Sequence, residues 1–155
     1  ARTYGTALSI AGKTRPKTGR DAKFSLSYCI ASAILRGTPA EASFSQQATQ
    51  DPELRALLER ITVIDDPKLD ACVPHNWPSR IEAVTESGRE LTAQVQAPKG
   101  DPENEISWAE CETKFRTMTL DILTDKQQDA VIAYAKGFDG VADFSRENLF
   151  RLANG

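Results

Sequence analysis

The chain has 155 residues, of which 40% are hydrophobic and 26% charged, and a formal net charge of −3 at pH 7. This composition fits a globular domain with its own core, and the acidic balance argues against a nucleic-acid-binding or polybasic membrane-binding surface. No apolar run is long enough to span a bilayer, and the three cysteines lie far apart without metal-ligand or CxxC spacing, so we expect a cytoplasmic protein with reduced thiols.

The first patterned segment covers residues 3–11 and alternates between two faces. One face carries Tyr4, Thr6, Leu8 and Ile10, and small residues stand between them. A period of two predicts a β-strand here. A polar loop over residues 12–21 follows, and its basic residues are expected to be solvated; the alternative is a local anion site.

The longest uncharged stretch lies between Lys23 and Arg36. Its residues are apolar or small on nearly every side, which predicts a buried helix from Phe24 to Arg36. Gly37 is a suitable C-terminal stop, and Leu26, Ile30 and Ile34 should face the sheet.

The next helix is predicted by its start signal, because Asp51 is a good N-cap and Pro52 suits the first helical position. Apolar residues three and four apart extend this helix to about Arg60; they are Leu54, Leu57, Leu58 and Ile61. A short β-branched strand over residues 61–64 and a proline-rich loop over residues 66–78 should follow.

A β-hairpin is predicted over residues 80–97. Its strands cover residues 80–85 and 90–97, and Ser87-Gly88 forms the turn between them. The second strand alternates, and its inward residues are expected to be Leu91, Ala93, Val95 and Ala97.

The chain reads as helical from Ser107 onward. Two capping boxes, Ser107 with Glu110 and Thr124 with Gln127, begin two helices, and Ser145 should cap a last short one. If these helices pack on a partner, we expect some of their apolar side chains to be exposed or covered by a second copy. The residues concerned are Phe115, Met118, Ile122, Tyr134, Phe138, Phe144 and Phe150.

Together these elements predict an α+β fold. Residues 1–104 should form a two-layer unit, with a mainly antiparallel sheet and helices on one of its faces. Residues 105–155 should form a helical C-terminal tail.

Three stretches carry a resemblance to a known family. They are Lys-Phe-Ser-Leu-Ser-Tyr-Cys-Ile-Ala-Ser-Ala-Ile-Leu-Arg-Gly over residues 23–37, Asp51-Pro52 with Leu54, Leu57 and Ile61, and Pro98-Lys99-Gly100-Asp101-Pro102 with Asn104 and Lys114-Phe115. In order and approximate spacing they resemble the C-terminal domain of the MmgE/PrpD family. That family includes 2-methylcitrate dehydratase, cis-aconitate decarboxylase and iminodisuccinate epimerase.

The resemblance implies an α+β lid domain of a lyase or isomerase that acts on a di- or tricarboxylate. A dehydratase of the 2-methylcitrate type, a carbon-oxygen lyase of propionate metabolism, is the first expectation. No metal or organic cofactor is implied. The implied partners are a small carboxylate substrate, a larger N-terminal helical domain to which the tail returns, and a second copy in a homodimer. Because the family's acid and base residues come mainly from the helical domain, this chain alone should be inactive.

The candidate site lies at the start of the uncharged helix. Free N–H groups there favour an anion, Lys23 adds charge, and Ser25 and Tyr28 add hydroxyl donors. In the resembling enzymes the tyrosine of this motif lies at the active-site cleft, which implies a catalytic role for Tyr28 and substrate binding by Lys23 and Ser25. The alternative is that Tyr28 packs in the core and Ser25 caps the helix.

Two other candidates lie in loops. Lys99 is the third candidate substrate-binding residue, beside Gly100 and Asn104. The alternative there is loop architecture, with a positive φ at Gly100 and a side-chain-to-backbone hydrogen bond from Asn104. His75 is the only histidine and matches no motif of the family, so an exposed loop residue is expected.

Two rival functions remain open on the sequence. The chain can instead be a non-catalytic binding or assembly subunit derived from the same fold. It can also be an unrelated ferredoxin-like domain that binds a small molecule, a reading that rests on the α+β pattern alone.

Overall fold

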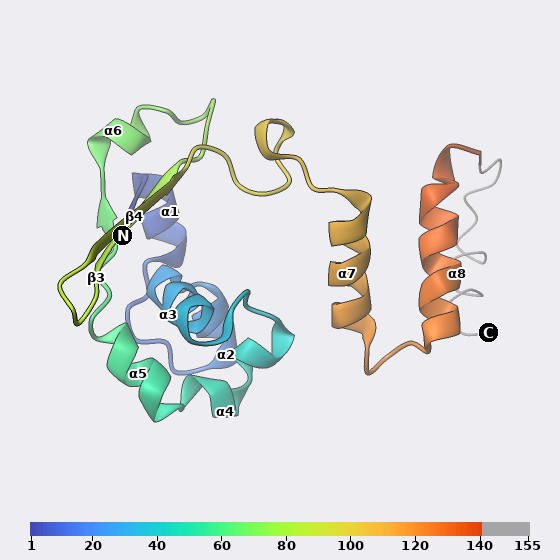
Figure 1. Cartoon of the computed structure of the whole chain (residues 1–155), viewed down its shortest axis with the longest axis horizontal. Coiled ribbons are helices and arrows are strands. Elements are labelled where there is room, and N and C mark those ends of the chain that lie inside the picture. Colours follow the sequence, from blue (N-terminus) through green and yellow to red (C-terminus); the bar gives the residue numbers. More distant parts are fainter. Residues whose placement is uncertain (141–155) are drawn as a thin grey trace. The chain divides into compact units, whose positions relative to one another are not determined.

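The computed structural model describes residues 1–140, and the helix expected after Ser145 lies outside them. The chain divides into two compact units, residues 1–105 and the residues from 106 onward (Figure 1), which are described separately. The elements of the first unit are β1 (Arg2–Thr3), α1 (Gly5–Ala11), α2 (Gly19–Lys23), α3 (Leu26–Arg36), the 3-10 turn η1 (Glu41–Phe44), α4 (Gln46–Thr49), α5 (Pro52–Leu58), β2 (Ile64–Asp65), α6 (Pro67–Asp70), β3 (Ser79–Val84), β4 (Glu90–Val95) and the 3-10 turn η2 (Pro102–Asn104). The second unit begins with α7 (Trp108–Thr119), α8 (Asp125–Lys136) and the 3-10 turn η3 (Phe138–Gly140).

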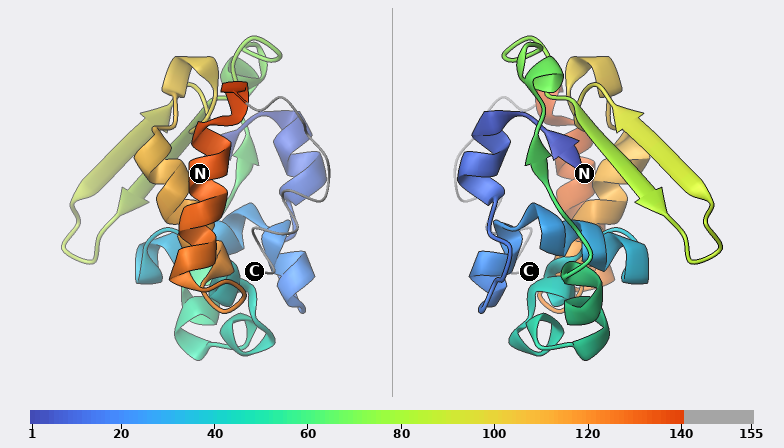
Figure 2. Two further views of the ribbon diagram at one scale, coloured as in Figure 1. Left: turned by 90° about the vertical axis from the view of Figure 1, so that its right-hand side faces the viewer. Right: turned by 90° about the vertical axis from the view of Figure 1, so that its left-hand side faces the viewer.

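The predicted α+β class is confirmed. Strands lie in the order β2-β1-β3-β4, and helices α2 to α5 gather at one end of the unit (Figure 2). β1 pairs with β2 in parallel and with β3 antiparallel, and β3 pairs with β4 antiparallel. The sheet is therefore mixed rather than purely antiparallel.

The predicted strand over residues 3–11 is wrong. Only Arg2 and Thr3 form a strand, and residues from Gly5 to Ala11 form α1. The Gly5 N–H donates to Asp70 Oδ1 at 3.0 Å, so a side chain distant in sequence satisfies a donor at the start of this helix. A short apolar alternation cannot exclude a helix when it is rich in alanine and leucine.

The bounds of helix α3 were predicted to within two residues, but the face that it buries was not predicted correctly. A cluster around it forms the main core; its members are Ala22, Tyr28, Ala31, Leu54 and Leu58. Ser25, Tyr28 and Ser32 are almost fully buried, whereas Ile34 is 60% exposed. The hydroxyl-bearing flank therefore faces the core, and the expectation that Ile34 faces the sheet is wrong.

The predicted start of α5 is confirmed. Asp51 Oδ1 accepts hydrogen bonds from the N–H groups of Glu53 at 2.8 Å and Leu54 at 3.2 Å, and Pro52 takes the first turn. Its other oxygen binds Arg36 at the end of α3. The Leu54 N–H first, then the Glu53 N–H and the Arg36 charge, hold the pKa of Asp51 below its usual value.

This shift predicts a pH-dependent contribution to stability. A carboxyl whose pKa is lowered on folding stabilises the fold above its unfolded pKa, and the contribution disappears as the pH falls through the lower folded value. Asp51→Asn should lower the urea midpoint at neutral pH, and the difference from wild type should vanish well below about pH 3.9. Glu53→Gln, which removes an exposed carboxylate from the same helix, is the control; an Asp51→Asn deficit that persists in acid would contradict the expectation.

The predicted hairpin is confirmed in position and turn. β3 and β4 pair without interruption from Ser79↔Val95 to Val84↔Glu90, and Gly88 has a φ of 80°. The expectation that one face of β4 points inward is wrong, because every residue of β4 is exposed within the described unit. Ala97, just beyond the strand, is 4% exposed, as expected for an inward residue.

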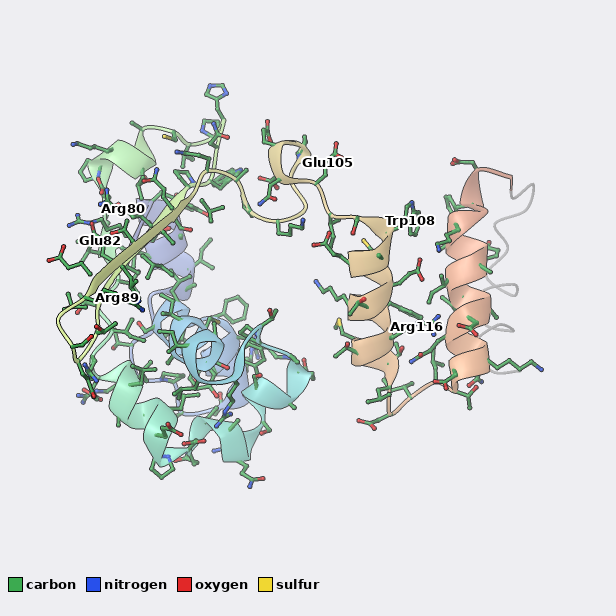
Figure 3. All side chains as sticks on the ribbon, viewed as in Figure 1. Arg80, Glu82, Arg89, Glu105, Trp108 and Arg116 are labelled. Carbon is green, nitrogen blue, oxygen red and sulfur yellow. The ribbon has the colours of Figure 1, made fainter. Side chains whose placement is uncertain are left out.

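The second unit places α7 and α8 side by side (Figure 1). Both predicted capping boxes are present. The buried residues of α8 are Gln128 and Ile132. Gln128 Nε2 donates to Thr119 Oγ1 at 3.0 Å, and Arg116, which is labelled in Figure 3, pairs with Asp129.

Apolar side chains on this unit are exposed, as predicted. Met118 is 57%, Ile122 76% and Phe138 50% exposed, whereas Phe115 and Tyr134 are half-buried. Phe144 and Phe150 lie outside the described residues. None of the helices described up to residue 140 has the length and apolar character to cross a membrane.

Candidate functional site

Ser25 begins helix α3 as its N-cap. Its Oγ accepts the Tyr28 N–H at 3.2 Å and donates to the carbonyl oxygen of Lys13, and the residue is fully buried. Both the hydroxyl and the N–H that it caps are thus occupied within the fold. A capping serine in this position stabilises the helix and offers no free donor to an anion.

Tyr28 lies in the core of the first unit. The residue is 1% exposed, its hydroxyl donates to the Ser43 carbonyl oxygen at 2.7 Å, and its ring centroid lies 6.0 Å from that of Phe44. Burial raises the pKa of Tyr28, so the phenol stays protonated and acts as a donor. This arrangement ties α3 to η1.

Lys23 is the surface member of the expected trio. Its Nζ lies 2.8 Å from Glu41 Oε1 and 2.9 Å from Oε2, and 5.7 Å from the centroid of the Phe44 ring. The side chain of Lys23 is 44% exposed and that of Glu41 70% exposed. An ion pair this exposed contributes little to stability, so a competing carboxylate can replace Glu41 at small cost.

The expected cleft with an open Tyr28 hydroxyl is therefore wrong, and the structural alternative is confirmed. Tyr28 is a packed core aromatic and Ser25 is a helix cap. The reason is the orientation of α3: the flank that bears its hydroxyl groups is the one that packs against η1 and the core. The structure places Lys23, Ser25 and Tyr28 together at the start of α3. Of the three, only Lys23 has a side chain exposed to solvent.

In the loop around Lys99, Gly100 and Asn104 have the structural roles that the sequence offered as the alternative to substrate binding. Gly100 has a φ of 106°, and its N–H donates to the Asn104 carbonyl oxygen at 2.8 Å. Asn104 Nδ2 donates to the Ala97 carbonyl oxygen at 2.9 Å. Lys99 itself is exposed on this loop, away in sequence from α3.

Other chemistry is scarce in the described part of the chain. His75 is exposed, as expected, in the loop between α6 and β3. No group of three or more potential ligands among residues 1–140 is arranged to hold a metal ion. The thiol of Cys29 lies beside the core, where burial raises its pKa and disfavours the reactive thiolate.

Two sets of polar contacts were missed by the sequence reading. One is the contact of Lys23 with Glu41 and with the Phe44 ring. No local sequence pattern predicts this contact, because the partners lie about twenty residues away. The other is on the sheet, where Glu82 binds Arg2 at 3.0 Å and Arg80 at 2.8 Å (Figure 3). The hydrogen bond from Arg2 lowers the pKa of Glu82. Strand pairing brings Arg2 of β1 to Glu82, whereas Arg80 lies two residues before Glu82 on the same strand.

Comparison with known proteins gives one positive finding. A family model described as the MmgE/PrpD C-terminal domain matches residues 1–139. Among curated proteins none matches the sequence.

Proposed function

Since the chain belongs to the MmgE/PrpD family and matches its C-terminal domain, we propose that it is part of a lyase or isomerase acting on a di- or tricarboxylate. The family match over residues 1–139 is the observation that carries this proposal. A dehydratase of the 2-methylcitrate type, working by removal of a proton next to a carboxylate in propionate metabolism, is the first substrate hypothesis. The protein would act in the cytoplasm.

Within this proposal the described domain binds and positions substrate, and the acid and base groups come from a helical domain. Lys23 supports a binding role, because its ammonium already holds a carboxylate, that of Glu41, at the surface. The buried Tyr28 hydroxyl supports a positioning role, since it fixes α3 against η1. Lys99 remains a candidate second contact for the substrate.

The exposed apolar side chains of the second unit support a helical partner domain. Trp108 is 56% and Met118 57% exposed on α7, and Ile122, in the turn that follows α7, is 76% exposed. Several large apolar side chains exposed on one small unit are typical of a surface that a partner covers. We assign this surface to the family's larger helical domain.

A second candidate function is a non-catalytic subunit that binds a carboxylate or assembles with other proteins. The internal use of the Ser25 and Tyr28 hydroxyls favours it, because both are hydrogen-bonded within the fold and neither is then free to act as an acid or base. The two functions separate in one assay: turnover of di- and tricarboxylates by the full-length gene product supports the enzyme, and binding without turnover supports the subunit.

Lys23 gives the sharpest test of substrate binding. In the full-length enzyme Lys23→Gln should raise KM about tenfold, the size expected for loss of a partly exposed charge-assisted hydrogen bond. The catalytic rate constant should change little, because the contact holds substrate and transition state alike. Steady-state kinetics with methylcitrate and cis-aconitate measure both constants.

Lys17→Gln is the matched control. Lys17 is an exposed lysine of the preceding loop whose ammonium makes no ion pair in the described part of the chain, so its loss should leave KM unchanged. Equal KM values for wild type and Lys23→Gln would exclude Lys23 from the substrate site.

A further inference from the structure

The ammonium of Lys23 lies beside an aromatic ring that is itself fixed by packing. Lys23 Nζ is 5.7 Å from the centroid of the Phe44 ring, and that ring lies 6.0 Å from the ring of Tyr28. The Tyr28 hydroxyl donates to the Ser43 carbonyl oxygen at 2.7 Å. A Cβ atom added at Gly19 would collide with the Phe44 carbonyl oxygen, so α2 and η1 pack closely at this point. The packing of η1 on α2 therefore places the ring beside the ammonium independently of any ion pair.

A carboxylate of the chain already binds this ammonium. Both oxygens of Glu41 contact Lys23 Nζ, Oε1 at 2.8 Å and Oε2 at 2.9 Å. Glu41 is the first residue of η1, and residues 37–40 before it belong to no helix or strand. The Glu41 side chain is 70% exposed, so it can turn into solvent without breaking a buried contact. Glu41 thus occupies the position in which the carboxylate of a ligand would bind.

A second cation lies one turn earlier on the same helix. Arg20 and Lys23 are three residues apart in α2, which puts them on one flank with Cβ atoms about 5–6 Å apart. Arg20 is exposed, and its guanidinium makes no ion pair within residues 1–140. The carboxylate of Asp21, which lies between them in sequence, binds Lys13 instead. This flank of α2 therefore carries one cation with a carboxylate bound to it and one without.

We propose that Arg20 and Lys23 together bind a ligand with two carboxylates, and that one of these carboxylates displaces Glu41 from Lys23. This inference rests on the proposed function, because it takes Lys23 as a substrate contact; it adds a second contact and an internal competitor. Arg20 binds one carboxylate with the fork of its guanidinium, and Lys23 binds the other as a point charge. Cations one helical turn apart suit carboxylates on neighbouring or next-but-one carbons of a short chain, as in succinate and tricarballylate.

A ligand with a single carboxylate gains little at this site. Displacement of Glu41 exchanges one exposed carboxylate on Lys23 for another, so the exchange alone supplies almost no net affinity. The contact with Arg20 is the additional one, because no carboxylate among residues 1–140 has to leave this guanidinium. The displaced Glu41 also remains attached to η1, where its charge repels the anion that replaced it. Removal of this internal competitor should therefore strengthen binding.

The test is calorimetric titration of the full-length gene product with tricarballylate, which has no hydroxyl group to eliminate and therefore reports binding without turnover. Glu41→Gln should lower the Kd about two- to fivefold, the size expected for loss of a competing exposed ion pair. In a Lys23→Gln background the same change should give no gain, because the contact for which Glu41 competes is absent. Glu53→Gln, which removes an exposed carboxylate of α5, is the matched control and should leave the Kd unchanged.

The contribution of Arg20 is measured with the same ligand. Arg20→Gln should raise the Kd about three- to fivefold, and Arg20→Lys, which keeps the charge but loses the fork, should lie between this variant and wild type. Arg60→Gln removes an exposed arginine just beyond α5 and should leave the Kd unchanged. An unchanged Kd in Arg20→Gln or in Glu41→Gln overturns the proposal, and so does a gain from Glu41→Gln that persists without Lys23.

The failure of this inference can be told from the failure of the proposed function. If Lys23→Gln weakens binding but Arg20→Gln and Glu41→Gln do not have the expected effects, Lys23 remains a substrate contact and only the inference is wrong. If Lys23→Gln binds tricarballylate as well as wild type does, or if wild type does not bind it, the inference is wrong together with the assigned role of Lys23. Turnover of a di- or tricarboxylate is assayed separately and decides whether the protein is a lyase or isomerase.

Discussion

Tyr28→Ala should destabilise the chain by about 3–5 kcal/mol, the cost of removing a large aromatic side chain from a packed core. Tyr28 is 1% exposed and belongs to the same buried cluster as Leu54 and Leu58. Because the whole stability of a domain is about 5–15 kcal/mol, this loss is a large share of it, and the variant should unfold at a clearly lower urea concentration than wild type. Urea denaturation followed by circular dichroism measures the loss.

Tyr28→Phe separates packing from the hydroxyl. The ring remains, the hydrogen bond to the Ser43 carbonyl oxygen is lost, and the expected cost is about 1 kcal/mol. Tyr4→Phe is the matched control, because the Tyr4 ring packs edge-on against Trp77 and its hydroxyl makes no hydrogen bond within residues 1–140. The control should be close to wild type.

Tyr28→Phe and Tyr28→Ala also test what Tyr28 does in the full-length enzyme. If the hydroxyl only fixes α3 against η1, Tyr28→Phe should reduce turnover no more than its loss of stability explains. A folded Tyr28→Phe protein with turnover reduced by a factor of about a hundred or more would restore the acid-base role, since general acid-base groups contribute about that much. Wild-type stability in Tyr28→Ala would contradict the core position.

Features set by a few adjacent residues were predictable from the sequence. Asp51 caps α5, Ser107 and Thr124 begin α7 and α8 with capping boxes, and Gly88 forms the hairpin turn. Each depends on hydrogen bonds or a φ angle within three or four residues, so the local sequence contains the necessary information. Gly100 behaves in the same way, and the Asn104 side chain reaches only slightly further, to the Ala97 carbonyl oxygen seven residues before it.

Features that depend on distant contacts were not predictable. The start of α1 is satisfied by Asp70, which lies 65 positions away, and the local alternation of residues 3–11 suggested a strand instead. The burial of α3 is decided by its neighbours α2 and α5, because the helix has apolar or small residues on nearly every side. Its own sequence could not tell which flank would face them.

The candidate site shows the same division. That Lys23, Ser25 and Tyr28 gather at one helix start follows from their spacing. Whether their polar groups are free is a tertiary property: Glu41, Lys13 and Ser43 bind them, and none of these partners could be identified from the motif. The residue types therefore predicted where the candidate site lies. The hydrogen-bond partners determine which of its polar groups remain free to bind a ligand.

The 155-residue chain by itself should show no turnover of methylcitrate, cis-aconitate or iminodisuccinate. Around Lys23 the described hydroxyls are engaged within the fold, and the single histidine lies in an exposed loop. Loss of one general acid or base costs about 10²–10⁴ in rate, and loss of substrate positioning costs more. We therefore expect a rate at least about 10⁴-fold below that of the full-length enzyme.

Proton NMR of each substrate with equal molar amounts of the chain and of the full-length protein measures this difference. Binding should be scored in the same samples, because a chain that binds a tricarboxylate through Lys23 without converting it fits a domain that positions substrate for groups supplied elsewhere. Lys23→Gln should then weaken that binding, and Lys17→Gln should not. Turnover by the chain within about a hundredfold of the full-length rate would mean that residues 1–155 contain a complete acid-base pair.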